Sequence, residues 1–179
     1  EPIISKTLPV SSELIPTLRS KHFIRFPNEQ APLQLLALKI RTRLSRLAEF
    51  TNLHIFVVTL RCDHSCPYCQ VSRQSESTGK FDMTVQMADK SLDFVFMSPN
   101  PAIKIEFQGG EPLLNFEMVK YVVLQAKQRN LKERRDLQFV IATTLSLLTD
   151  DVLDFCKQHN IVLSSSLDGP MDLHNANRP

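Results

Sequence analysis

The sequence predicts an α/β fold built on a parallel sheet, because short apolar segments alternate with helical ones from residue 54 onward. Residues 54–60 (HIFVVTL) are β-branched and almost wholly apolar, as expected for a parallel strand covered on both faces. Residues 83–97 then have helical spacing and end before Pro99. Repeated strand–helix units require right-handed crossovers and therefore a parallel sheet.

Three further strands and two further helices follow along the chain. The expected strands are residues 102–107, 137–142 and 161–166. Asn115 and Thr149 are expected to cap the helices that follow the second and third strands, because their side chains can accept a backbone hydrogen bond. Reactive groups in parallel α/β folds lie just past the carboxyl ends of the strands. The site is therefore expected at the ends of the predicted strands.

Residues 1–53 are expected to form a different segment from residues 54–179. Five of the eleven prolines fall within the first 32 residues, where they interrupt regular structure. A helix is predicted from Leu33 to about Phe50, because apolar residues recur at spacings of 3, 4 and 7. Its apolar stripe comprises Leu33, Leu36, Ala37, Ile40, Leu44, Leu47 and Ala48.

Composition and charge favour a globular protein and give no sign of a membrane or nucleic-acid partner. The chain has 179 residues, of which 42% are hydrophobic and 22% charged, a mixture typical of one globular domain. The net charge of +2 gives no electrostatic reason to expect nucleic acid or a membrane as a partner. Neither a spanning apolar run nor a signal-peptide pattern is evident in the sequence, so a cytoplasmic location is expected.

Three of the four cysteines lie within eight residues, at Cys62, Cys66 and Cys69, directly after the first predicted strand. Cysteines this close cannot cross-link distant segments, and an odd number leaves one unpaired. Three thiolates can bind three irons of a [4Fe–4S] cluster and leave the fourth iron open as a Lewis acid. The alternative is a zinc site completed by His64, within a binding module whose basic helix recognises a peptide or RNA. Cys156 is expected in the core.

The C-x3-C-x2-C spacing, with Tyr68 before the last cysteine, resembles the cluster loop of radical S-adenosylmethionine enzymes. The resemblance implies that Cys62, Cys66 and Cys69 ligate a [4Fe–4S] cluster whose open iron chelates S-adenosylmethionine. The backbone around Tyr68 would lie against the adenine. An electron from an external donor would then cleave a carbon–sulfur bond, and the resulting 5′-deoxyadenosyl radical would abstract a hydrogen atom from substrate.

A second motif after the second strand supports the same resemblance. Gly109-Gly110-Glu111 followed by proline is similar to the G-G-E-P segment of the family. Adjacent glycines allow close backbone approach and leave amides exposed. The resemblance implies that this backbone and Glu111 hold the amino group of S-adenosylmethionine. It also implies that Gln108 points toward the cofactor or the substrate.

The end of the fourth strand resembles a peptide-modifying branch of the family, related to anaerobic sulfatase maturases. The matching residues are S-L-D-G-P, which begins at Ser166, and H-x-x-x-R, which ends at Arg178. Ser166 would contact the polar end of the cofactor, and Arg178 would pair with its carboxylate. The sequence departs from the branch after Thr143, where Thr144-Leu145 stands in place of Asn-Gly. This departure removes an amide side chain and the freedom for positive φ.

The resemblance also carries expectations about fold and substrate. The segments LRCDHSCPYCQVSR and KIEFQGGEPLLNF are most similar to the radical maturase of the His-Xaa-Ser peptide system, so a ribosomally made peptide or protein is the implied substrate. RNA or a small metabolite is the alternative substrate. The implied fold is a partial (β/α) barrel with an N-terminal helical extension, truncated after about four units. The rest of the barrel and the branch's cysteine-rich C-terminal domain with auxiliary clusters are expected to be missing from this sequence, and a partner or the missing chain is expected to cover the open edge.

Overall fold

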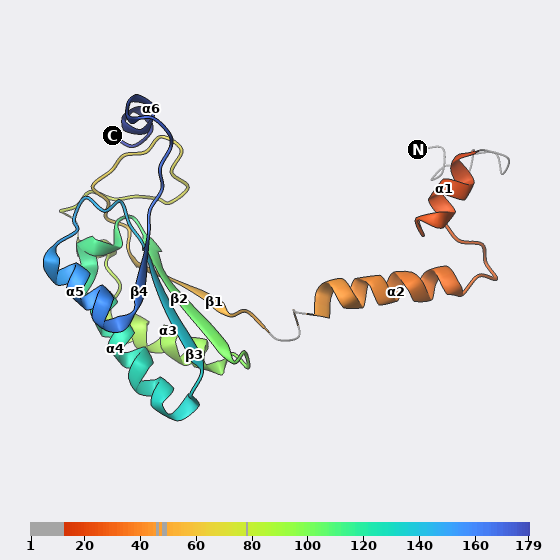
Figure 1. Ribbon diagram of the computed structural model, residues 1–179, viewed down its shortest axis with the longest axis horizontal. Helices are drawn as coiled ribbons and strands as arrows, with labels where there is room; N and C mark the ends of the chain where they lie inside the picture. The colour runs from red at the N-terminus through yellow and green to blue at the C-terminus, as the bar shows by residue number, and fades with distance from the viewer. Residues whose placement is uncertain (1–12, 46, 48–49, 78) are drawn as a thin grey trace. The chain divides into compact units, whose positions relative to one another are not determined.

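The computed structural model describes residues 13–45, 47, 50–77 and 79–179. The chain divides into two compact units, residues 1–49 and 50–179. The second unit contains a four-stranded sheet (Figure 1). Its strands are β1 (Leu53–Thr59), β2 (Ala102–Gly109), β3 (Asp136–Ala142) and β4 (Ile161–Ser164). Neighbouring strands are parallel and follow chain order, which confirms the predicted α/β fold.

The principal helices of the second unit lie on one face of this sheet (Figure 1). They are α3 (Val85–Met97), α4 (Phe116–Glu133) and α5 (Asp150–His159). Right-handed crossovers between strands in chain order place every connecting helix on the same side, as in a barrel. Two short 3-10 helices, η2 (Gly79–Phe81) and η3 (Pro112–Asn115), lie in the connections, and a helix that was not predicted, α6 (Met171–Asn177), follows β4.

The core forms between this helix layer and one face of the sheet. In β2, Ile103, Ile105 and Phe107 are buried, and the residues between them are only half-buried because they point to the other face. The expectation that the first strand is covered on both faces is wrong. Ile55 and Val57 are 51% and 44% exposed, because α3, α4 and α5 all pack on the opposite face.

Side-chain hydrogen bonds at the starts of α5 and α4 fix these helices to the chain around them. The Thr149 hydroxyl accepts a hydrogen bond from the Val152 amide, which confirms the predicted cap of α5. Asn115 occupies the N-cap position of α4, as predicted, but the expected capping bond is wrong, since its side chain makes no such bond. Asn115 is the last residue of η3, which leads directly into α4. Its Nδ2 donates to the Val58 carbonyl at 2.9 Å and so joins η3 to β1.

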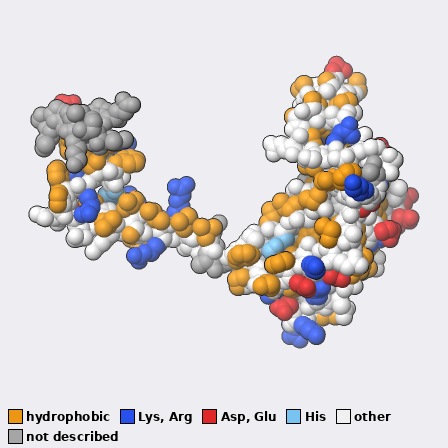
Figure 2. Space-filling view, turned by 180° about the vertical axis from the view of Figure 1, so that it is seen from behind, with side chains coloured by type: hydrophobic (Ala, Val, Ile, Leu, Met, Phe, Trp, Pro, Cys, Tyr) orange, Lys and Arg blue, Asp and Glu red, His pale blue; other side chains and the backbone are white. Residues whose placement is uncertain are grey.

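The first unit contains α1 (Leu14–Ser20) and α2 (Ala31–Leu44). The helix predicted over residues 33–50 corresponds to α2, although residues 46, 48 and 49 lie outside the described part of the chain. No residue of α2 is buried, and Figure 2 shows hydrophobic side chains gathered along it. Within the described ranges, every helix is too short or too polar to cross a membrane.

Candidate functional site

The segments that follow the four strands meet at one edge of the sheet, because all four carboxyl ends point the same way. The cysteine loop follows β1, and the Gly-Gly-Glu turn follows β2. Thr143 and Thr144 follow β3. Strand β4 ends at Ser164, two residues before the predicted end, so Ser166 belongs to the loop at this edge.

The cysteine loop is closed by backbone hydrogen bonds at its base. The Cys62 amide donates to the Gln74 carbonyl at 3.2 Å, and the Gln74 amide donates to the Leu60 carbonyl at 2.7 Å. The thiols of Cys62 and Cys66 are half-buried and that of Cys69 is exposed, and all three are free of disulfides. Burial raises the pKa of the Cys62 thiol. Among the residues the structure describes, no three His, Cys, Asp or Glu side chains converge closely enough to hold a single metal ion.

A partly buried ion pair joins Arg61, at the start of the cysteine loop, to Asp82, where the chain comes back to the sheet. Arg61 donates from Nε to Asp82 Oδ1 and from Nη2 to Asp82 Oδ2, each at 2.8 Å. The Thr59 hydroxyl donates to the same carboxylate at 2.6 Å, and Arg61 Nη2 also reaches the Leu114 carbonyl at 2.6 Å. This two-pronged geometry is the strongest form of an arginine–carboxylate pair. The cysteine loop therefore starts from a rigid base.

The two glycines allow the turn after β2 to pack against the base of the cysteine loop. A Cβ on Gly110 would lie 1.9 Å from the Arg61 carbonyl oxygen, and one on Gly109 would lie 2.1 Å from the Thr59 carbonyl oxygen. The Gly110 amide donates to Thr59 at 2.9 Å, and the Glu111 amide donates to Arg61 at 2.7 Å. The expectation of exposed amides is therefore wrong for these two groups, because the neighbouring backbone already accepts their hydrogen bonds.

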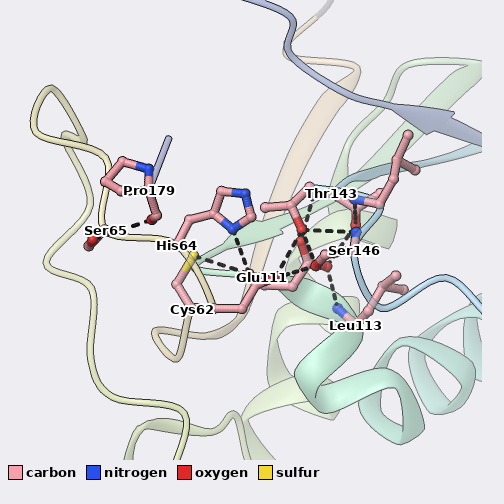
Figure 3. Close-up of polar contacts among 11 residues, drawn as sticks. Cys62, His64, Ser65, Glu111, Leu113, Thr143, Ser146 and Pro179 are labelled. Carbon is pink, nitrogen blue, oxygen red and sulfur yellow. Dashed lines mark hydrogen bonds and ion pairs between the residues drawn. The ribbon is translucent and has the colours of Figure 1, made fainter. Parts of the chain in front are cut away.

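Glu111 is fully buried, and its carboxylate accepts three hydrogen bonds (Figure 3). Oε1 accepts from the Leu113 amide at 2.9 Å and from the Thr143 hydroxyl at 2.8 Å. Oε2 accepts from the Thr144 amide at 2.6 Å. A buried carboxylate needs such donors to offset its loss of water. Thr143 and Thr144, of which Thr144 stands in place of the branch's asparagine, thus join the turns after β2 and β3.

Asp63, beside the first cysteine, links the cysteine loop to the turn after β3. Its Oδ2 accepts from the Thr144 hydroxyl at 3.3 Å and from the Ser146 hydroxyl. Its Oδ1 lies 3.4 Å from His64 Nδ1. One ring nitrogen of His64, the ligand in the zinc alternative, therefore faces a carboxylate in this structure.

A hollow of about 290 Å³ lies between the ends of β2, β3 and β4. Its lining includes five residues expected to contact the cofactor or substrate: Gln108, Gly109, Gly110, Ser166 and Arg178. The volume is near the lower end for small-molecule sites, roughly 300 Å³. The other two residues with that expectation, Tyr68 and Glu111, are not part of the lining. The structure thus gathers most of the predicted binding residues around one space.

Tyr68, Asp168 and Arg178 form a polar group beside this hollow. The Tyr68 hydroxyl donates to Asp168 Oδ2 at 2.6 Å, and Arg178 Nε donates to Asp168 Oδ1 at 3.0 Å. The hydrogen bond to Asp168 raises the pKa of Tyr68 to about 12. The same bond, helped by Arg178, lowers the pKa of Asp168. The carboxylate is therefore ionised at neutral pH.

Sequence reasoning missed the acidic residues that organise this site. Asp63 adjoins a predicted ligand, and Asp168 lies in a segment already singled out, so proximity to motifs was the available signal for both. Asp82 gave no such signal, because it lies 21 residues from Arg61 and joins it only after the loop folds back.

Comparison with known families agrees with this geometry. The model of the radical SAM superfamily matches residues 56–179. The chain belongs to this superfamily. Its members use a [4Fe–4S] cluster and S-adenosylmethionine. Within this family, the four parallel strands and their connecting helices correspond to a partial radical SAM barrel, as predicted.

Individual relatives cover most of this chain. The uncharacterized protein MJ0907 of Methanocaldococcus jannaschii is 30% identical over 70% of this chain and 41% of its own length. The serine-type anaerobic sulfatase-maturating enzyme of Bacteroides thetaiotaomicron is 25% identical over 65% of this chain and 29% of its own length. A solved structure of native anSMEcpe with bound AdoMet matches 70% of this chain and 34% of that chain, with a TM-score of 0.60 and 23% identity, and shows the shared fold. The chain thus spans less than half the length of these relatives.

Proposed function

We propose that this chain is the cofactor-binding part of a radical SAM enzyme that modifies a ribosomally made peptide or protein of the His-Xaa-Ser type. The observation that carries the proposal is the juxtaposition, at one edge of the sheet, of a loop with three free thiols and a hollow of about 290 Å³. Parallel α/β folds carry their chemistry at this edge.

The donor set fits a [4Fe–4S] cluster that keeps one iron free of protein ligands. Cys62, Cys66 and Cys69 offer three thiolates from one loop, and thiolates are the usual ligands of such clusters. Cys156 is only 4% exposed and packs in the core, so it is not a candidate for the fourth ligand. When bound, the cluster and S-adenosylmethionine would supply a 5′-deoxyadenosyl radical for hydrogen-atom abstraction.

The residues around the loop restrict its conformations before any cofactor binds. The Arg61–Asp82 pair holds the base of the loop, and Asp63 holds its first turn to the Thr144 hydroxyl. Fixing a loop in advance lowers the entropy lost when its ligands bind. These residues would therefore favour cluster binding without serving as its ligands.

The hollow offers groups suited to the amino-acid end of S-adenosylmethionine. Among the described residues, Arg178 uses only Nε in side-chain hydrogen bonds, which leaves its terminal nitrogens for a carboxylate. Ser166 also lines the hollow and offers a hydroxyl. Three protein donors occupy most acceptor positions of the fully buried Glu111 carboxylate, so direct contact with an ammonium group would require access to the remaining lone pair of Oε2.

The substrate assignment rests on similarity and on the motifs around the cysteines. A sulfatase-maturating relative supports a protein substrate, and the flanking residues favour the His-Xaa-Ser type. Gln108 lines the hollow and donates to Glu106 at 2.6 Å, which gives that wall polar groups for a peptide. Reductive cleavage of the cofactor consumes one electron, so an external donor is part of the proposal.

Iron and sulfide content tests the cluster site. After anaerobic reconstitution, the chain should hold about four irons and four sulfides. Cys66→Ala should lose most of this content and the associated formation of 5′-deoxyadenosine. Cys156→Ala removes a thiol from the core and serves as the matched control that should retain both. Stoichiometric zinc without sulfide in the original chain would contradict the assignment.

Isotope transfer tests the substrate class. The full-length protein that contains this chain should move deuterium from a perdeuterated His-Xaa-Ser peptide into 5′-deoxyadenosine. A peptide of the same composition in scrambled order is the control and should transfer much less. Transfer from RNA or from a small metabolite, with none from either peptide, would favour the alternative substrates.

A further inference from the structure

One carboxylate bridges the cysteine loop and the segment that follows β4. Asp168 accepts from the Tyr68 hydroxyl through one oxygen and from Arg178 Nε through the other. The guanidinium carbon of Arg178 lies 5.5 Å from the centroid of the Tyr68 ring, within cation–π range. The three side chains therefore form a closed triangle. The side chains of Asp168 and Arg178 are 16% and 17% exposed, so solvent screens their pairing less than that of a fully exposed pair.

The local fold brings the two ends of this ion pair together across ten residues. Gly169 has φ +124°, a conformation that other residues rarely adopt, and turns the chain into α6. The Asp168 amide donates to His174 Nδ1 on α6 at 3.3 Å. Helix α6 then returns the chain so that Arg178 lies against Asp168. The pair is thus built into the fold of this segment.

A second contact joins the same two segments independently. The Ser65 amide donates to the Pro179 carbonyl at 2.7 Å, and the Ser65 hydroxyl lies 3.3 Å from the same oxygen (Figure 3). Ser65 and Tyr68 flank Cys66 in the sequence. The middle of the cysteine loop is therefore held on both sides of one predicted cluster ligand.

We infer that Asp168 is a positioning residue that locks the cysteine loop through Tyr68 and aims Arg178 into the hollow. Its effect on the cofactor rests on the function proposed above. Because Asp168 engages Nε of Arg178, the terminal nitrogens of the guanidinium remain on the side available to a ligand. Removal of this one carboxylate should therefore loosen the cysteine loop and misdirect Arg178 at the same time.

Hydrogen exchange of the metal-free full chain tests the lock on the loop. Asp168→Asn and Tyr68→Phe should each accelerate amide exchange across residues 62–74 by about tenfold, the scale expected for loss of a charged hydrogen bond. Combining the two should add little, since both break the same contact. Asp172→Asn, on exposed α6, and Tyr121→Phe, which breaks a similar 2.9 Å bond to Asp89, are the matched controls.

The control variants should exchange like the original chain, and all variants should keep protection in β2 and β3. Unchanged loop exchange in Asp168→Asn would overturn the inference, and so would full additivity of the two substitutions.

A spectroscopic titration tests the effect on Arg178. In reconstituted protein, the change that S-adenosylmethionine causes in the electron paramagnetic resonance of the reduced cluster should need a several-fold higher concentration in Asp168→Asn than in Asp172→Asn. The signal before addition should be the same in both. Equal half-saturating concentrations would overturn this part of the inference. If the proposed function is wrong, the original chain will itself show no cluster signal. The exchange experiment would then still test the contact between Asp168 and Tyr68.

Discussion

Replacing Glu111 by glutamine tests whether this buried carboxylate holds the site together. Glutamine has one acceptor oxygen, which can keep the bonds from Leu113 and Thr143 if it replaces Oε1. Its NH2 group then faces the Thr144 amide, 2.6 Å from the present oxygen, and two donors oppose each other. A charged hydrogen bond contributes about 1.5–3 kcal/mol, and an unpaired buried donor costs roughly 1–3 kcal/mol. Relief from burying a charge offsets part of this sum, so we expect Glu111→Gln to lower the free energy of unfolding by about 3 kcal/mol.

Urea unfolding of the cofactor-free chain, followed by circular dichroism, measures this change. Glu117→Gln is the matched control, because the Glu117 side chain is 85% exposed and, among the described residues, its ion pair is with Lys120 on the surface of α4. Its effect should stay within about 0.5 kcal/mol. Equal urea midpoints for the two variants would refute the structural role assigned to Glu111.

Two further predictions concern packing and pH. Gly110→Ala should lower the free energy of unfolding by about 3 kcal/mol, because its Cβ would lie 1.9 Å from the Arg61 carbonyl oxygen. Gly79→Ala, with 3.8 Å of clearance, should change it by less than about 1 kcal/mol, and equal urea midpoints would count against the close packing. Burial, followed by the charge of Lys127, lowers the pKa of His159 from 6.5, so the unfolded chain binds more protons and stability should fall as pH drops through about 6.5. His159→Gln should flatten that decline in urea titrations, and an unchanged slope would contradict the assignment.

Much of the fold was predictable because apolar residues recur at different spacings in strands and in helices. Residues 54–60 and 102–107 predicted β1 and β2, and sequential crossovers require the helices to share one face. The exposure of Ile55 and Val57 was not predictable from these residues alone. An apolar strand in an open barrel has the same composition as one covered by helices on both faces.

The cysteines were predictable because their spacing is local, whereas the groups that hold them are not local. Thr144 reaches Glu111 across 33 residues and Asp63 across 81 residues. Such contacts depend on which turns meet at the edge of the sheet, and no short motif encodes them. The replacement of Asn-Gly by Thr144-Leu145 was visible as a departure from the family, but the hydrogen bonds that Thr143 and Thr144 make required the structure.

The proposed function requires that Cys62, Cys66 and Cys69 hold an iron cluster with one iron open to S-adenosylmethionine. Electron paramagnetic resonance of the reduced, anaerobically reconstituted chain decides whether they do. A [4Fe–4S] signal that changes on addition of S-adenosylmethionine is the predicted result. A protein that contains one zinc and no cluster signal, or a cluster signal that S-adenosylmethionine leaves unchanged, would contradict it.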